Sequence, residues 1–212
     1  MNTVFRLLLC AAIAACAGCA HLPAADHAPD RTAASEPAPL LLISIDAYRY
    51  DYIDRGLSPH LEMLARHGVQ VASMQPSFPS LTFPNHYTLV TGLRPDHHGI
   101  VDNTMFDPQL GKFSLGNRKA VSDGRWWDEA TPIWVTADEQ GVRTATMFWP
   151  GSEAAIHGRR PDYWRPFDDS VSADARVDQV LAWLDLPPAL RPRFLTLYFD
   201  AVDHAGHKFG PD

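Results

Sequence analysis

The stretch that decides the fold is Leu40-Leu41-Leu42-Ile43-Ser44-Ile45-Asp46. Its nearly continuous apolar run is typical of a β-strand buried on both faces of a parallel sheet. Asp46 follows this run at once, and an ionised carboxylate is costly to bury without a partner. The alternative for Asp46 is a side chain that caps the following turn. The stretch therefore predicts a buried strand with a carboxylate at its carboxyl end.

Helix and strand patterns alternate on the C-terminal side of this run. One helix is expected from Ser58-Pro59 to Gly68, another from Thr131-Pro132 to Gly141, and a third from Ser172. The predicted strands among them are residues 69–74, 142–148 and 194–199. This alternation predicts an α/β fold with a mainly parallel sheet flanked by helices. Ligands of such sheets bind outside the carboxyl ends of the strands.

The composition of the 212-residue chain is globular, with 46% hydrophobic and 20% charged residues. Its net charge of −7 leaves no basic surplus for binding a nucleic-acid duplex. A small anionic substrate is compatible with this charge if metal ions supply local positive charge.

The first 19 residues have the pattern of a secretory signal. An apolar run at 7–15 follows a single basic residue and is too short to span a bilayer. The ending Ala17-Gly18-Cys19 resembles a lipoprotein cleavage site, which makes Cys19 a candidate lipid anchor, although Cys16 stands where such signals usually have Leu. We expect an exported bacterial protein, either periplasmic or membrane-anchored; a buried N-terminal helix is the alternative.

The leader also contains all three cysteines, Cys10, Cys16 and Cys19. Residues 20–39 are rich in Ala, Pro and Asp and predict a flexible linker. Residues 40–212 then form the candidate catalytic region, which has no cysteine. A metal ion in that region must be held by carboxylate, imidazole or hydroxyl groups.

Asp203 and His207 lie four residues apart after the strand predicted at 194–199. Their oxygen and nitrogen donors suit zinc or a similar divalent ion. Gly206 is expected to let the backbone turn so that both groups face one ion, and His204 is expected to point elsewhere. Solvated loop residues are the alternative reading of this pair.

Thr82 lies in the segment Pro79–Gly92, which predicts a loop leading into a helix. We expect Thr82 near the helix start, where backbone N–H groups favour anions. Its hydroxyl is a weak nucleophile unless a base or a metal activates it. An N-cap is the alternative role, and the two roles are compatible.

Short motifs in a fixed order resemble the nucleotide pyrophosphatase/phosphodiesterase family of the alkaline phosphatase superfamily. They extend from about residue 40 to the end of the chain, and their order makes the combined signal stronger than any single motif. The motifs are Ser44-Ile45-Asp46, Thr82-Phe83-Pro84-Asn85-His86-Tyr87 with Thr91-Gly92, His98-Gly99-Ile100, Asn103-Thr104-Met105-Phe106-Asp107-Pro108, Phe148-Trp149-Pro150-Gly151-Ser152, and Asp203 with Gly206-His207.

The resemblance implies two zinc ions and a covalent mechanism. Asp46 and Thr82 resemble ligands of one zinc, and Asp203 and His207 resemble ligands of the other. Thr82 resembles the nucleophile that attacks phosphorus. Asn103 resembles the side-chain donor that holds a phosphate oxygen together with the backbone around Thr82.

The resemblance also implies a binding pocket and a substrate class. Phe83, Phe167 and Tyr198 resemble aromatic positions that line a nucleobase or leaving-group pocket, with ordinary core packing as the alternative. Family members cleave nucleotide phosphodiesters and pyrophosphates, so a small nucleotide or phosphodiester is the expected substrate. The alternatives are a related hydrolase acting on a lipid-type or phosphonate substrate, and a non-catalytic truncated remnant.

Two departures from the family pattern affect these expectations. Ser80 and Leu81 stand where the family commonly has Thr and Lys, which makes Ser80 a rival nucleophile. The family also supplies an Asp-His pair and a further His from a later part of the domain. A catalytic zinc normally keeps three protein ligands, and each zinc here has two up to Asp212. Residues 1–212 alone are therefore expected to bind metal weakly and to be inactive or nearly so.

Overall fold

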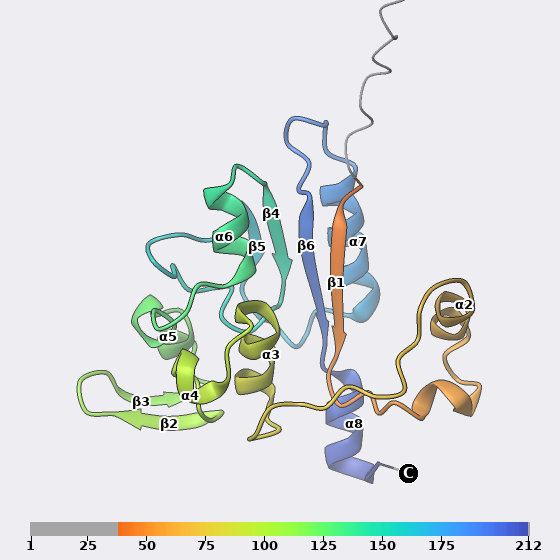
Figure 1. Ribbon diagram of the computed structural model, residues 1–212, viewed down its shortest axis with the longest axis horizontal. Helices are drawn as coiled ribbons and strands as arrows, with labels where there is room; N and C mark the ends of the chain where they lie inside the picture. Colours follow the sequence, from red (N-terminus) through yellow and green to blue (C-terminus); the bar gives the residue numbers. More distant parts are fainter. Residues whose placement is uncertain (1–37, 212) are drawn as a thin grey trace, which may run out of the picture. The chain divides into compact units, whose positions relative to one another are not determined.

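A computed structural model describes residues 38–211 and contains a four-stranded sheet in the order β1-β6-β4-β5 (Figure 1). Every pairing in this sheet is parallel. The strands are β1 (Leu40–Ile45), β4 (Thr144–Met147), β5 (Tyr163–Arg165) and β6 (Phe194–Phe199). The predicted α/β fold with a mainly parallel sheet is confirmed. The leader and residues 20–37 of the linker lie outside the described residues, so export and lipid attachment stay predictions.

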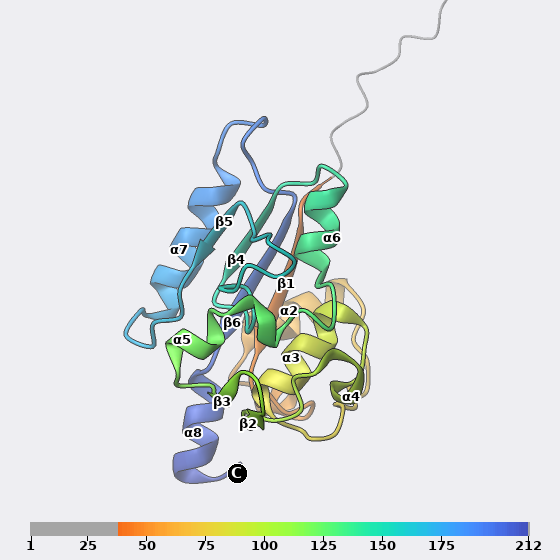
Figure 2. The same cartoon turned by 90° about the vertical axis from the view of Figure 1, so that its left-hand side faces the viewer.

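Helices cover both faces of the sheet (Figure 2). Helix α7 (Ala173–Leu184) lies on one face, and α3 (Thr82–Thr91) and α6 (Ile133–Glu139) lie on the other. The remaining elements are η1 (Tyr52–Arg55), α2 (Pro59–His67), α4 (Pro95–His98), β2 (Thr104–Asp107), β3 (Gly111–Ser114), α5 (Arg118–Val121), η2 (Gly124–Trp126) and α8 (Ala201–Phe209). None of the helices within residues 38–211 has the length and apolarity needed to cross a membrane.

The register of the sheet brings strand ends together at one edge. Ile45 at the end of β1 is the partner of Phe199 at the end of β6, and Met147 of β4 is the partner of Leu197. The Asp46 amide extends the first ladder by donating to the Phe199 carbonyl oxygen over 2.9 Å. Whatever follows β1, β4 and β6 in the sequence therefore meets at the carboxyl edge of the sheet.

The expectation that β1 is buried on both faces is wrong for the sheet formed by residues 38–211, because β1 is an edge strand of that sheet. Leu40 is 61% exposed and Ile43 is 49% exposed. The buried strands are β4, whose residues are all buried, and β6, which lies between β1 and β4 and has every residue buried except its last. An apolar run indicates that a strand tends to be buried, but it does not predict which strand lies at the centre of the sheet.

Two apolar clusters pack against the sheet on its opposite faces. The cluster beside α3 and α6 contains Tyr87, Trp127, Trp134 and Trp149, and the cluster beside α7 contains Trp183 and its neighbours. Buried aromatic side chains of this size contribute much of the burial energy of a small core. The Tyr87 hydroxyl is satisfied within the core, because it donates to the Trp127 and Ala130 carbonyl oxygens.

The helices expected from sequence are confirmed, with differences in how they begin. Ser172 caps α7, and its Oγ accepts from the Ala175 amide at 3.2 Å. Ser58 precedes α2 without a side-chain capping bond, so the proline in the first turn is the stronger start signal there.

The strand predicted at residues 69–74 is wrong. Val69 is 93% exposed and Val71 is 68% exposed, and this part of the chain is irregular. Its apolar residues resemble a strand, but no neighbouring strand supplies hydrogen bonds to it. The β2–β3 hairpin was not predicted, although Asp107 marks its turn by accepting from the Gln109 and Leu110 amides.

Acid is expected to destabilise the fold through the fully buried His98 ring. Its Nδ1 accepts from the Ile100 amide at 3.2 Å, so this nitrogen must be unprotonated. Burial lowers the pKa of His98 below its ordinary 6.5, with hydrogen bonds to backbone and the Asp96 charge acting in the opposite direction. The unfolded chain therefore takes up the proton first, and stability present above pH 6.5 is lost as pH falls through the lowered pKa.

Urea unfolding at pH 7 and at pH 5 measures this loss. The side-chain amide of His98→Gln retains a donor toward the Pro84 carbonyl oxygen but takes up no proton. Between pH 7 and pH 5, its free energy of unfolding should therefore fall less than that of the wild type, by about 1 kcal/mol per pH unit. An exposed histidine gives the matched control, and His60→Gln should keep the wild-type slope. An unchanged slope in His98→Gln would contradict the assignment.

Candidate functional site

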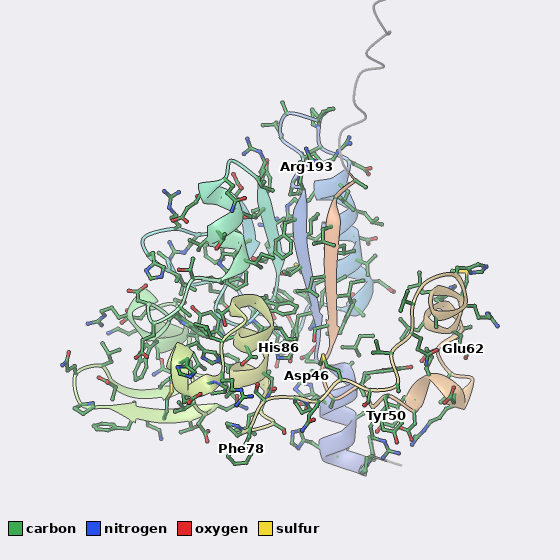
Figure 3. All side chains as sticks on the ribbon, viewed as in Figure 1. Asp46, Tyr50, Glu62, Phe78, His86 and Arg193 are labelled. Carbon is green, nitrogen blue, oxygen red and sulfur yellow. The ribbon has the colours of Figure 1, made fainter. Side chains whose placement is uncertain are left out.

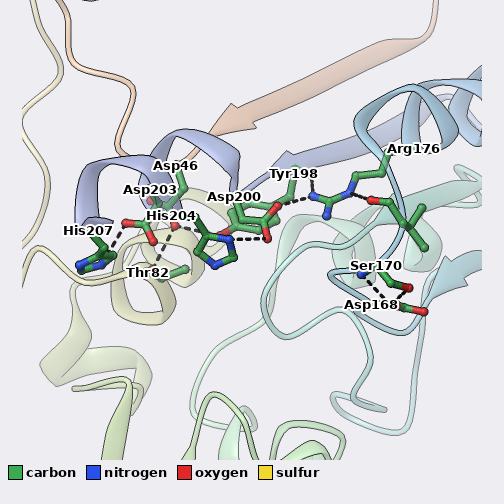
Figure 4. Close-up of polar contacts among 11 residues, drawn as sticks. Asp46, Thr82, Asp168, Ser170, Arg176, Tyr198, Asp200, Asp203, His204 and His207 are labelled. Atoms are coloured by element: carbon green, nitrogen blue, oxygen red, sulfur yellow. Dashed lines mark hydrogen bonds and ion pairs between the residues drawn. The ribbon is translucent and has the colours of Figure 1, made fainter. Parts of the chain in front are cut away.

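Four side chains from three parts of the chain meet at the carboxyl edge of the sheet (Figure 4). Asp46 follows β1, Thr82 begins α3, and Asp203 and His207 belong to α8, which follows β6. The four residues predicted as metal ligands are thus gathered in one region. Sheet register and the short connection from β6 to α8 explain this convergence.

The Asp46 carboxylate connects Thr82 with Tyr198. Asp46 Oδ2 accepts from Thr82 Oγ1 at 3.0 Å and from the Tyr198 hydroxyl at 2.8 Å. Burial, followed by the charge of Asp46, raises the pKa of Tyr198 far above its ordinary value, so the phenol is a neutral donor. The alternative of Thr82 as an N-cap is wrong, because Leu81 occupies the N-cap position and Thr82 is the first helical residue.

His86, in the turn of α3 that follows Thr82, is buried (Figure 3). His86 Nδ1 is 2.7 Å from the Thr82 carbonyl oxygen, and His86 Nε2 is 2.8 Å from Ser44 Oγ. Burial lowers the pKa of His86, while the nearby Asp46 charge opposes this shift. No role of its own was assigned to His86 from the sequence, and its place in the Asn85-His86-Tyr87 motif was the only signal.

Asp203 and His207 share one face of α8 because they are four residues apart on a helix. Asp203 Oδ1 lies 3.5 Å from His207 Nε2, and the His207 side chain is 80% exposed. The expected turn at Gly206 is wrong, since Gly206 lies inside the helix. The expectation that His204 points elsewhere holds only in part: Nδ1 lies 3.7 Å from Asp200 Oδ2, but the side chain lines the same cavity as Asp203 and His207.

Asn103 precedes β2 and faces the start of α3. Its Oδ1 accepts from the Phe83 amide at 2.9 Å. This contact satisfies one of the free N–H groups of the first helical turn, and Pro84 has none to satisfy. The Asn103 side chain retains Nδ2 as its donor.

A cavity of about 190 Å³ opens beside these residues. Its wall combines apolar rings with charged groups, as ligand pockets commonly do. The predicted site residues that line it are Thr82, Phe83, Asn103, Phe167, Tyr198, Asp203 and His207. Asp46 is the remaining predicted residue, and it reaches the cavity through its bond to Thr82.

Sequence reasoning missed an ion pair in the cavity wall. Arg118 contacts Glu153, whose side chain is 7% exposed, and Glu153 Oε1 also accepts from the Phe167 amide at 3.1 Å. The Arg118 guanidinium lies 6.0 Å from the centre of the Phe167 ring. The only sequence signal was the position of Glu153 shortly after β4, since Arg118 belongs to a separate short helix.

A second missed pair lies deeper, at the end of β6. Arg176 Nη1 donates to Asp200 Oδ1 at 2.7 Å and to the Tyr198 carbonyl oxygen at 3.2 Å. Both side chains are nearly buried, with 4% and 11% of their surfaces exposed. The pair therefore fixes the point at which β6 passes into α8.

The donor atoms fit zinc in kind, but each pair is incomplete. Asp46 with Thr82 offers oxygen donors, and Asp203 with His207 offers oxygen and nitrogen, a set that suits zinc. Across residues 38–211, however, no three His, Cys, Asp or Glu side chains gather closely enough to hold a metal ion. Each pair needs at least one further ligand to complete the usual three.

Comparison with known proteins places these motifs in a family. Residues 40–212 match the family model described as Type I phosphodiesterase / nucleotide pyrophosphatase. An uncharacterised pyrophosphatase/phosphodiesterase of Schizosaccharomyces pombe is 48% identical over 174 residues, which cover 82% of this chain and 36% of that protein. Ectonucleotide pyrophosphatase/phosphodiesterase family member 1 of Homo sapiens is 42% identical over 186 residues, which cover 86% of this chain and 20% of that protein.

Solved structures agree with this placement. Murine ectonucleotide pyrophosphatase/phosphodiesterase 5 superposes with a TM-score of 0.77 at 39% identity, over 82% of this chain and 46% of that chain. An inactive threonine-to-alanine variant of that murine protein, in complex with AMP, gives a TM-score of 0.78 at 38% identity, over 83% of this chain and 46% of that chain. This chain thus spans less than half the length of the relatives compared. It belongs to the Type I phosphodiesterase / nucleotide pyrophosphatase family.

Proposed function

We propose that the protein is a zinc-dependent nucleotide phosphodiesterase or pyrophosphatase with Thr82 as its nucleophile. The observation that carries the proposal is the contact between Thr82 Oγ1 and Asp46 at 3.0 Å, on the wall of the cavity and at the start of a helix. A helix N-terminus favours an anionic group such as phosphate. The inactive threonine-to-alanine variant of the murine relative supports a threonine nucleophile in the family.

Asp46 and Thr82 would hold one zinc ion, and Asp203 and His207 the other. Bound zinc ions would supply the positive charge that activates a hydroxyl and stabilises the attacking and leaving oxygens. Residues 38–211 give each ion two ligands, so each site depends on at least one ligand from elsewhere. We therefore propose that residues 1–212 by themselves bind zinc weakly and turn over slowly.

The chain's own residues orient the attacking group. The Thr82 hydroxyl donates to Asp46 Oδ2, which leaves its oxygen lone pairs available to the cavity. The Tyr198 hydroxyl donates to the same carboxylate oxygen and helps to fix its position beside Thr82. In the reaction, the Thr82 hydroxyl gives its proton to solvent as its oxygen bonds to phosphorus, and the leaving group departs with the electron pair of its P–O bond. Water later attacks the same phosphorus, adds its hydroxide to the released phosphate and returns a proton to the Thr82 oxygen.

Donors and rings of the cavity bind the substrate. Asn103 Nδ2 donates to a phosphate oxygen, because Oδ1 of the same amide is engaged by the Phe83 N–H. Phe167 and Tyr198 have ring centroids 6.3 Å apart and both face the cavity, which suits a planar base or leaving group. Phe83 also packs on Phe113 at 5.8 Å, so its ring serves the core as well.

A nucleotide fits this cavity better than a lipid-type diester. The Arg118–Glu153 pair places polar donors and acceptors beside Phe167, where an acyl chain would meet two charges. AMP in the murine relative supports the same substrate class. Comparing turnover of a nitrophenyl nucleotide ester with that of a choline-phosphate ester separates the two; faster cleavage of the choline ester would favour the lipid-type alternative.

Metal removal tests the proposed function. The complete protein that contains residues 1–212 should hydrolyse a nitrophenyl nucleotide ester at least about 100-fold more slowly after dialysis against a chelator. The reason is that the positive charge supplied by the zinc ions is then lost. Zinc should restore activity, and magnesium at the same concentration should not. Full activity after verified removal of zinc would exclude the proposal.

A further inference from the structure

His86 occupies a position that the proposed chemistry does not use. It lies in the second turn of α3, is 4% exposed, and stands between the nucleophile's helical turn and the end of β1 (Figure 3). It does not line the cavity. Its two ring nitrogens nevertheless contact two elements that must stay in register for Thr82 to meet Asp46.

The partners of the ring fix which nitrogen carries the proton. The Thr82 carbonyl oxygen, 2.7 Å from His86 Nδ1, can only accept, so Nδ1 is the protonated nitrogen. In the neutral ring Nε2 then accepts, and the Ser44 hydroxyl donates to it over 2.8 Å. The result is a directed chain from the Ser44 hydroxyl through the imidazole to the Thr82 carbonyl.

The ring itself is held firmly by its surroundings. Trp149 packs edge-on against it with centroids 5.3 Å apart, and Tyr198 packs edge-on at 5.1 Å. The Trp149 indole N–H also donates to the His86 carbonyl oxygen at 3.1 Å. Because the ring is fixed in this way, it holds Thr82 at a nearly constant position relative to Ser44.

Other restraints act on the start of α3 from its flanks, where Asn85 Nδ2 donates to the Pro79 and Leu81 carbonyl oxygens at 2.8 and 3.0 Å. The N-cap residue Leu81 makes no side-chain capping bond, and Pro84 in the first turn has no N–H to donate. Asn103 holds the Phe83 amide from the opposite side. The Ser44–His86 contact joins α3 to strand β1 itself, two residues before Asp46, and so acts beside the Thr82–Asp46 contact.

We propose that His86 is a positioning residue, and that the Ser44–His86–Thr82 bridge sets the Thr82 hydroxyl against Asp46. Misplacement of a reacting group by a fraction of an ångström to about 1 Å lowers rates by up to about 100-fold. The consequence for catalysis rests on the proposed function, whereas the bridge itself does not.

Three variants break the bridge at different points. His86→Asn places an amide donor near the Nδ1 position and loses the acceptor for Ser44. His86→Gln reaches the Nε2 position and loses the donor to Thr82, and Ser44→Ala leaves the imidazole intact. Each should lower kcat by about 10- to 100-fold with KM changed less than about 3-fold, because the bridge aligns the attacking atom without touching substrate.

Non-additivity and a matched control distinguish positioning from general destabilisation. Ser44→Ala combined with His86→Gln should be no slower than the worse single variant, because both interrupt one bridge. Thr88→Ala, on the same helix but bonded to His98, should lower stability without lowering kcat of the folded protein. Additive losses, or wild-type kcat in Ser44→Ala, would overturn the proposal.

Two measurements that do not depend on turnover test whether the Ser44–His86–Thr82 bridge exists, even if no hydrolysis is found. Nitrogen NMR of the ring should show Nδ1 protonated and Nε2 unprotonated, and Ser44→Ala should lengthen the Thr82 Oγ1 to Asp46 Oδ2 distance beyond its 3.0 Å in a crystal structure. A ring protonated at Nε2, or an unchanged distance in Ser44→Ala, refutes the bridge. Absence of hydrolysis in the wild type would refute the proposed function alone.

Discussion

Thr82→Ala should reduce hydrolysis of a nitrophenyl nucleotide ester by at least about a thousand-fold, because the attacking oxygen is removed. The loss should appear in kcat, while AMP should still bind with a Kd within several-fold of wild type. Asn103 and the aromatic wall remain in place, and they contact ligand independently of the hydroxyl. Steady-state kinetics and AMP titration of the complete, zinc-loaded protein measure both quantities.

Two hydroxyl variants give this experiment its controls. Thr82→Ser keeps an oxygen beside Asp46 and should recover part of the activity, whereas Ser80→Ala should leave activity near wild type. Ser80 was the rival nucleophile, but its side chain is exposed and does not line the cavity. A large loss in Ser80→Ala together with an active Thr82→Ala would reverse the assignment.

The sequence located much of the architecture because its strongest signals are local. The run Leu40–Ile45 is a strand with the predicted bounds, and the helix after Ser172 begins where capping chemistry places it. Signals of this kind depend on neighbouring residues, so they can be read without knowledge of the tertiary packing. The segment 69–74 shows the limit, because a strand also needs a partner that the segment itself does not reveal.

The same distinction between local and long-range signals applies to the candidate site. Asp46, Thr82, Asp203 and His207 were found because each stands in a short motif next to a strand or helix end, and the fold gathers them. That they act as ligands or nucleophile stays a prediction. Contacts between distant residues escaped detection, since nothing near Arg118 in the sequence points to Glu153. Spacing along the chain carries no information about such pairs.

Removing the buried guanidinium of Arg176 is expected to cause the largest loss of stability. Its Nε donates to the Val171 carbonyl oxygen at 3.0 Å, and its Nη1 donates to Asp200 and to the Tyr198 carbonyl oxygen. The guanidinium also lies 5.0 Å from the centre of the Phe148 ring. Arg176→Met keeps much of the volume but leaves the Asp200 carboxylate without its cation, so the free energy of unfolding should fall by about 3–5 kcal/mol.

Most of the expected loss in the free energy of unfolding comes from the unpaired Asp200 carboxylate, so the test removes that charge as well. Arg176→Met combined with Asp200→Asn should regain a large part of the loss, because no unpaired carboxylate remains at the β6–α8 junction. Arg165→Met is the matched control. The exposed Arg165 guanidinium of β5 bonds the uncharged side chain of Gln179 on α7, so its loss leaves no unpaired charge and should change stability by less than about 0.5 kcal/mol. Urea unfolding of the zinc-free protein at pH 7 measures all three. If Arg176→Met lost less than about 1 kcal/mol, or the double variant were no more stable than the single, this ion pair would not be what holds the end of β6 in place beneath the site.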